Sequence, residues 1–152
     1  MTGVADRLAE LGITLPTVAP AAGSYLPTVR SGDHVYTAGQ LPFADGQLVA
    51  TGKVGAEVSP EDATAIARQA GLNLLAAIDA EVGLDNVVRV VKVVGFVASA
   101  PGFTGQPGVI NGVSDLLFEV FGEAGRHARS AVGVAELPLG APVEVEAVVE
   151  VR

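Results

Sequence analysis

The sequence predicts an α+β fold with a mixed or antiparallel sheet and two long helices packed on one face. Two segments with helical spacing of apolar residues are separated by one strand-like segment, and paired strand-like segments stand towards both ends of the chain. Helices and strands therefore do not alternate as they do in parallel α/β folds. A length of 152 residues suits one domain, so we expect residues 1–152 to form a single unit.

The composition indicates a core of aliphatic side chains. Hydrophobic residues make up 49% of the chain, whereas aromatic residues make up 5% and charged residues 17%. Val, Ala, Leu and Ile must therefore fill the core. Helices on one face of the sheet leave its other face uncovered, and its strands are too apolar to face water. We therefore expect copies of the chain to associate.

Several classes of protein are disfavoured by composition. The formal net charge is −8 and the nine basic residues are scattered, which argues against a nucleic-acid partner. The absence of cysteine excludes disulfides, cysteine metal sites and a cysteine nucleophile. The first residues, "MTGVADRLAELGITLP", lack the basic and apolar regions of a signal peptide, and no apolar run approaches the roughly 20 residues of a membrane span. We expect a cytoplasmic protein with no membrane partner.

The first third of the chain predicts one helix and several short strands. Residues 2–11 read as a helix that Gly12 and Pro16 end, followed by an extended connector, "PTVAPAAGSYLP". The helix and connector, residues 1–19, either cover a cleft or cover core. Two strand-like pieces then surround a Ser-Gly-Asp turn in "TVRSGDHVYTAGQLPF". Asp45-Gly46 is a hairpin signal.

Residues 59–82 form the clearest predicted helix. Ser59 is a good N-cap, Pro60 suits the first helical position, and Glu61 and Asp62 favour the positive end of the helix dipole. Gly83 ends the helix. Its apolar stripe contains Ala63, Ile66, Ala67, Ala70, Leu74, Ala77 and Ile78.

The rest of the chain predicts a central strand, a second long helix and two final strands. "VVRVVKVVGFVASA" is rich in β-branched residues, which fits a strand buried on both faces, and Gly95 marks either a bulge or a close backbone approach. After a loop, "PGFTGQPG", residues 108–124 are expected to be helical and to end at Gly125. The stripe of this helix contains Ile110, Val113, Leu117, Val120 and Phe121. Strands are expected at about 129–135 and 142–151.

Arg129 is the first candidate functional residue. It begins the strand "RSAVGVAEL" directly after a glycine-terminated helix. Its guanidinium presents a rigid fork of donors that matches a carboxylate, and nearby backbone N–H groups can add donors. The alternative is an ordinary salt bridge at a strand end.

The final strand, "VEVEAVVEV", provides the second candidate. Its Val and Ala residues alternate with Glu144, Glu146 and Glu150, so the three acids share one face. Three acids on one face usually indicate a solvated surface. If a neighbouring subunit covers that face, however, a partly buried carboxylate could position or deprotonate a water molecule.

Other residues carry weaker signals, and each has an ordinary structural alternative. Tyr25 lies in a loop and could simply pack, whereas Asn111 could donate an amide to a ligand or cap a turn. Gly39 could allow a ligand near the backbone or accommodate a bulge. The two histidines, His34 and His127, flank no nucleophile signature and are interpreted as surface residues. Phosphate-loop, dinucleotide-binding and zinc-protease motifs are absent.

Two long stretches resemble the RidA/YjgF family. "HARSAVGVAELPLGAPVEVEAVVEV" is similar to the C-terminal signature of that family, and "GSYLPTVRSGDHVYTAGQLP" to its N-terminal signature. The helix with Asn111 and the stretch "GEAGRHARS" also fit. The resemblance covers residues 20–152. The N-terminal helix and "SAPGFTGQP" extend beyond the compact family pattern, which suggests a longer, divergent subgroup.

The resemblance implies a fold, an assembly and a chemistry. The fold would be chorismate-mutase-like, and the assembly a homotrimer with clefts between subunits. The reaction would be hydrolysis of enamines or imines such as 2-aminoacrylate to 2-keto acids and ammonia, with no metal or cofactor. Arg129 would clamp the substrate carboxylate, Glu144 would position water and the backbone N–H of Ala131 would add a contact. Tyr25, Gly39 and Asn111 would line the cleft.

The sequence departs from the family pattern in ways that bear on the substrate. The stretch Thr37-Ala38-Gly39-Gln40 has alanine where the family usually has a serine hydroxyl, and Leu26 and Pro27 follow the tyrosine in place of polar residues. Both changes make the pocket less polar. Two other functions therefore stay open: a non-catalytic trimer that binds a small carboxylate, and the ribonuclease or translation-inhibitor activity of older family names, which the acidic chain disfavours.

Overall fold

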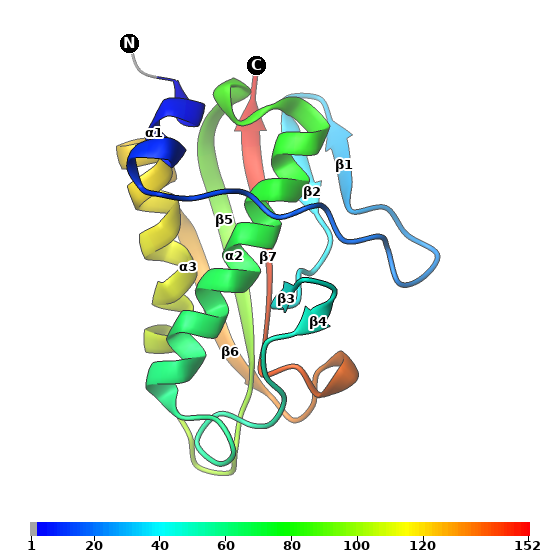
Figure 1. Cartoon of the computed structure of the whole chain (residues 1–152), viewed down its shortest axis with the longest axis vertical. Helices are drawn as coiled ribbons and strands as arrows, with labels where there is room; N and C mark the ends of the chain where they lie inside the picture. Colours follow the sequence, from blue (N-terminus) through cyan, green and yellow to red (C-terminus); the bar gives the residue numbers. More distant parts are fainter. Residues whose placement is uncertain (1–2) are drawn as a thin grey trace.

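The fold is a five-stranded mixed sheet with two long helices on one face (Figure 1). The computed structural model describes residues 3–152. The strands lie in the order β1-β2-β7-β5-β6, and only the β5–β6 pair is parallel. The strands are β1 (Thr28–Ser31), β2 (His34–Thr37), β5 (Val87–Ala98), β6 (Ala128–Val134) and β7 (Val143–Val151). The α+β fold with two long helices on one face is as predicted.

A small hairpin stands apart from the main sheet. It pairs β3 (Phe43–Ala44) with β4 (Gln47–Leu48), and its turn is formed by Asp45 and Gly46, both with positive φ. Such backbone angles are typical of two-residue hairpin turns, so the Asp-Gly prediction is confirmed. Asn73 of the first long helix donates hydrogen bonds to the Leu41 and Phe43 carbonyls and ties the hairpin to the helix layer.

The first long helix, α2 (Pro60–Val82), begins and ends where the sequence predicts. Ser59 Oγ accepts a hydrogen bond from the Asp62 backbone N–H at 3.1 Å, and Gly83, with φ of 77°, follows the last helical residue. The whole predicted apolar stripe is buried against the sheet and the second long helix.

The second long helix, α3 (Gln106–Phe121), is shifted towards the N-terminus relative to the prediction. It begins two residues before 108, because Pro107 is accommodated in the first turn. It ends at Phe121 because Gly122 has φ of 63°, and a 3₁₀ turn, η2 (Gly122–Gly125), leads into β6. Gly125 therefore closes that turn and not the helix.

Glycines let α3 lie close to its neighbours. A Cβ on Gly95 of β5 would stand 2.5 Å from the Ile110 side chain, so this glycine marks a close backbone approach. A Cβ on Gly112 would stand 2.1 Å from the Thr64 carbonyl oxygen of α2. These contacts fix α3 over β5 and β6, which positions the helix face discussed below.

The strand β5 differs from its prediction as a strand buried on both faces. Its residues on the helix side, such as Val93 and Val97, are fully buried, whereas Val94 and Phe96 on the other face are only partly covered. Both helices pack on the same side, so residues 3–152 place no layer on the second face of the sheet (Figure 1). The apolar residues of β5 on this second face explain why its sequence indicated a strand buried on both faces.

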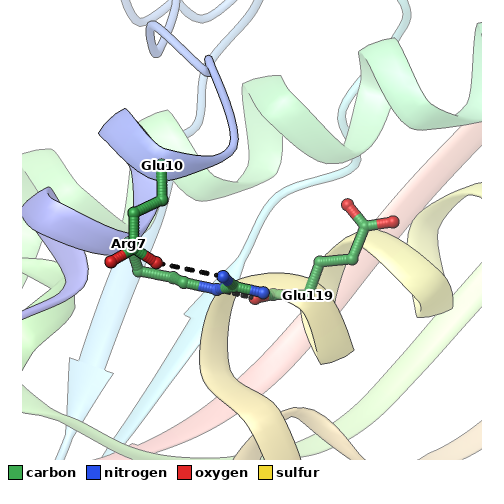
Figure 2. Close-up of polar contacts among 3 residues, drawn as sticks. All are labelled: Arg7, Glu10 and Glu119. Atoms are coloured by element: carbon green, nitrogen blue, oxygen red, sulfur yellow. Dashed lines mark hydrogen bonds and ion pairs between the residues drawn. The ribbon is translucent and has the colours of Figure 1, made fainter.

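The N-terminal helix, α1 (Val4–Glu10), packs at the C-terminal end of α3. Arg7 Nε donates to the Glu119 carbonyl at 2.8 Å, and Arg7 Nη1 pairs with Glu10 at 3.1 Å (Figure 2). Val4 and Leu8 pack against the main core. The segment therefore covers core and holds the end of α3. The predicted start at Thr2 lies outside the described residues.

Candidate functional site

Arg129 lies near the start of β6, and its side chain reaches α3. Its Nη1 donates hydrogen bonds to Asn111 Oδ1 at 2.8 Å and to Ser114 Oγ at 3.1 Å. Asn111 and Ser114 stand three positions apart on α3, so they share one helix face. Among residues 3–152, no carboxylate lies within ion-pair distance of Arg129. The salt-bridge alternative is therefore wrong within this chain, and the cation remains to attract an anion.

His127 and Ser114 complete a network behind Arg129 that the sequence analysis missed. The Nδ1 atom of His127 lies 2.7 Å from the Gly125 carbonyl oxygen, and Nε2 lies 3.0 Å from Ser114 Oγ. His127 is half-buried, and both of its ring nitrogens have partners within the chain, which the interpretation as a surface residue did not include. Burial lowers the pKa of His127, the hydrogen bond to Gly125 opposes this effect, and the charge of Arg129 lowers the pKa further.

The backbone N–H of Ala131 stands at a free edge of the sheet. β6 is an edge strand, and the Ser99 N–H donates to the Val134 carbonyl, so the backbone of Val134 faces β5. Successive residues of a strand direct their backbone groups to opposite sides. The backbone groups of Val132 and Val134 therefore face β5, and the N–H of Ala131 points away from it. We call Asn111, Ser114, Arg129 and Ala131 the arginine half-site.

A surface pocket of about 340 Å³ opens beside this half-site. The pocket lining carries charges of both signs, because Arg126 and Arg129 line it together with Asp115. Arg126 also lies over the Phe118 ring, 4.4 Å from its centroid. The full lining consists of Ser114, Asp115, Phe118, Gly125, Arg126, His127 and Arg129.

Glu144 lies on β7 against Gly39, which follows β2. Gln40 and Val145 exchange backbone hydrogen bonds of 2.7 and 3.0 Å and hold the two segments together. A Cβ on Gly39 would stand 2.7 Å from Glu144 Oε1, so this glycine makes room for the carboxylate of Glu144 within the chain. Burial raises the pKa of Glu144, and the charge of Glu146 raises it further. We call Gly39 and Glu144 the glutamate half-site.

Tyr25 lies in the loop before β1. β1 and β6 are the opposite edge strands of the sheet (Figure 1). The Tyr25 side chain is half-exposed, and its hydroxyl accepts a hydrogen bond from the Ala22 N–H at 3.2 Å. β2, β7 and β5 separate the β1 edge from Arg129. One chain therefore does not bring Tyr25 to the arginine half-site.

The two half-sites lie on opposite faces of the sheet. Arg129 pairs in register with Val93, which is fully buried beneath the helices, so Arg129 is on the helix side. Glu144 pairs with Phe96 and alternates with the buried Val143 and Val145, so it is on the open side. One chain therefore does not bring Arg129 and Glu144 together.

No helix in the described part of the chain has both the length and the apolar character needed to cross a membrane. Within residues 3–152, no three His, Asp or Glu side chains gather in a way that could hold a metal ion.

Comparisons with known proteins identify relatives over nearly the whole chain. A family model described as "YjgF/chorismate mutase-like, putative endoribonuclease" matches residues 5–150. A Trypanosoma cruzi protein named TCP17 is 49% identical over 151 residues, which cover 98% of this chain and 94% of that protein. A 2-iminobutanoate/2-iminopropanoate deaminase of Dermatophagoides farinae is 31% identical over 140 residues, covering 92% and 95%.

A solved structure agrees in fold as well as in sequence. A crystal structure of an Agrobacterium tumefaciens protein of unknown function aligns with 98% of this chain and 92% of its own, with 45% identity and a TM-score of 0.91. These matches extend into α1, so the N-terminal segment is shared with relatives of this length. By sequence and by fold, the chain belongs to the RidA/YjgF family of chorismate-mutase-like proteins.

Proposed function

We propose that the chain is an imine deaminase that hydrolyses small carboxylated imines and enamines, of the 2-aminoacrylate type, to 2-keto acids and ammonia. The observation that carries the proposal is the pair of half-sites. One offers an uncompensated guanidinium next to a free backbone N–H, and the other offers a partly buried carboxylate with a raised pKa. The relative of Dermatophagoides farinae named as an imine deaminase supports this class of reaction.

The two half-sites would meet between copies of the chain in a homotrimer. The open face of the sheet carries a group of apolar residues, and we assign a second copy to it. Each copy holds its two half-sites on opposite faces of the sheet, so a neighbouring copy would bring the complementary half-site to each. Three copies around one axis would close the assembly and form three equivalent clefts. The apolar residues of this face include Val29, Tyr36, Val94, Phe96, Val132 and Val148.

The reaction needs few groups because an imine carbon is already electrophilic. The substrate carboxylate accepts hydrogen bonds from Arg129 and from the Ala131 N–H. Glu144 takes a proton from a water molecule, whose oxygen forms a bond with the imine carbon. The proton that Glu144 has taken passes to the nitrogen, which gives a carbinolamine. Transfer of the hydroxyl proton to the nitrogen then allows the C–N bond to break. Ammonia leaves, and the water oxygen becomes the keto oxygen of the product.

The shape of the glutamate half-site bears on the substrate. Ala38 precedes Gly39, so a methyl group stands where related sequences are expected to carry a hydroxyl. Together with Leu26, which is exposed in the tyrosine loop, this change favours imines with apolar side chains over those with polar ones.

A coupled assay tests the proposal. Imines are generated in situ from several amino acids by an amino-acid oxidase, and keto-acid release is timed with the wild type, Arg129→Ala and Arg68→Ala. Loss of the carboxylate clamp should lower the rate enhancement by about a hundredfold or more. Arg68→Ala is the control with the same charge change, because Arg68 pairs with Glu119 on the helix surface. Wild-type turnover by Arg129→Ala would refute the role of the clamp.

A second function, a non-catalytic trimer that binds a small carboxylate, is favoured by the missing hydroxyl at Ala38. In that case 2-oxobutanoate should raise the melting temperature of the wild type but not that of Arg129→Ala, while no imine is turned over. Turnover of any imine in the series by the wild type alone would exclude this alternative.

A further inference from the structure

The side chains behind Arg129 form a continuous chain of hydrogen bonds with one consistent direction. A carbonyl oxygen only accepts, so the short contact with Gly125 requires the proton on His127 Nδ1. Arginine only donates, so Ser114 Oγ accepts from Arg129 Nη1. Nε2 of a neutral His127 then accepts a hydrogen bond of 3.0 Å from the Ser114 hydroxyl.

Protonation of His127 would disturb this order. With a proton on both ring nitrogens, His127 donates a hydrogen bond to Ser114 Oγ, which also accepts from Arg129. The Ser114 hydroxyl hydrogen must then turn away and loses the Nε2 acceptor that orients it. A second cation would also stand behind the guanidinium. The half-burial of His127 and the charge of Arg129 both disfavour that state and lower its pKa.

Other charged groups near His127 leave this balance in place. Asp115 and Arg126 line the same pocket, one of each sign, and Arg126 is paired with Glu123 of η2. From β5, Lys92 stands opposite Ala128 and directs its ammonium to Ser130 on the other sheet face. No carboxylate among residues 3–152 forms an ion pair with His127.

We infer that His127 is a positioning residue: in its neutral form it orients the Ser114 hydroxyl, which together with Asn111 fixes the Arg129 guanidinium for carboxylate binding. This inference rests on the proposed function for its effect on turnover, but its effect on carboxylate binding does not require turnover. Ser114 is the link through which His127 acts.

Substitutions separate positioning from simple charge. His127→Gln keeps an oxygen that can accept from Ser114 but cannot titrate, so it should retain carboxylate binding. His127→Leu removes the acceptor at similar volume and should raise KM about tenfold with a smaller change in kcat. Ser114→Ala should have the same effect, and the double variant His127→Leu/Ser114→Ala should be no worse than either single variant, because both break one link.

The pH dependence has a definite sign. The pKa of His127 lies below its ordinary value of 6.5. The wild type should therefore lose affinity for 2-oxobutanoate as the pH falls below 6.5, whereas His127→Gln should show no such loss. If His127 acted only as a nearby charge, its protonation would strengthen binding of the anion at acidic pH. Stronger binding at low pH, or identical profiles for the wild type and His127→Gln, would overturn the inference.

Nuclear magnetic resonance tests the network without any assay of activity. The chain has only two histidines, so His34 serves as an internal reference in the spectrum. The resonances of His127 should titrate below pH 6.5 in the wild type, and their midpoint should rise in Arg129→Ala, which removes the neighbouring charge. If this holds and 2-oxobutanoate binds but no imine is hydrolysed, the proposed deaminase fails while the positioning role stands. A midpoint unchanged by Arg129→Ala would contradict the network itself.

Discussion

At the scale of single residues, the chemistry depends on how closely side chains approach the backbone. Glu144 carries its carboxylate against Gly39, with Oε1 only 2.7 Å from the position that a Cβ would occupy. Burial and Glu146 raise the pKa of this carboxyl, so the half-site prepares a group that can exchange a proton nearer to neutral pH. The absence of a side chain at Gly39 therefore leaves room for the Glu144 carboxylate in this position.

Gly39→Ala should displace the Glu144 carboxylate and lower kcat by about tenfold or more, because small displacements of a reacting group are costly. The backbone of Gly39 does not have a positive φ, so alanine is tolerated there without backbone strain. Steady-state kinetics check the prediction, with Gly108→Ala as the control because a Cβ at Gly108 meets open space. Unchanged kcat in Gly39→Ala would show that the position of Glu144 is not limiting.

The sequence predicted some of these residues better than others. Arg129, Asn111, Glu144 and Gly39 stand in motifs, so a family resemblance finds them. His127 could not be assigned in this way, because its partner Ser114 lies 13 positions away and the pair meets only after α3 has packed beside β6. Their polarity gives no periodic signal in the sequence.

At the scale of elements, the packing of α3 decides where the arginine half-site lies. Asn111 and Ser114 reach Arg129 because α3 lies close to both α2 and β5. Gly112 permits the contact with α2, and Gly95 permits the contact with the sheet. The position of α3 along the sheet is further held by Arg7 of α1 at the Glu119 carbonyl.

Gly112→Ala should destabilise the fold by about 3 kcal/mol, since a Cβ there meets the backbone of α2, which cannot rotate away as a side chain could. Gly108→Ala, on the same helix but in open space, should be neutral or stabilising by about 0.5 kcal/mol through its helix propensity. Urea unfolding at fixed protein concentration measures both changes. Equal stability of the two variants would contradict the close packing of α2 and α3.

The elements were largely predictable, but their ends and exposure were less so. Ser59 and Gly83 mark the ends of α2 through local rules of capping, which depend on neighbouring residues alone. The end of α3 was misplaced because Gly122 and Gly125 are both plausible stops, and only Gly122 has the positive φ that ends the helix. The sequence of β5 alone misled on its exposure, because an apolar sheet face that carries no helix layer has the same composition as a buried face.

At the scale of the whole molecule, the sheet separates the two groups that the proposed reaction must combine. Arg129 is held on the helix side near one edge, and Glu144 stands on the open side of β7. No bending of one chain brings them together without breaking the sheet. A site shared between subunits explains both the apolar residues of the open face and the separation of the two half-sites. Each cleft would take its arginine from one subunit and its glutamate from another.

Subunit mixing tests this central claim most directly. Arg129→Ala and Glu144→Gln should each be inactive alone, because every cleft then lacks one group. When the two variants are coexpressed in equal amounts and form mixed trimers, about one quarter of the clefts should receive both intact groups from different subunits and activity should return to about that fraction of the wild type. If the mixed trimers, confirmed by mass spectrometry, stay inactive, Arg129 and Glu144 do not complete one another across subunits and the account of the site is wrong.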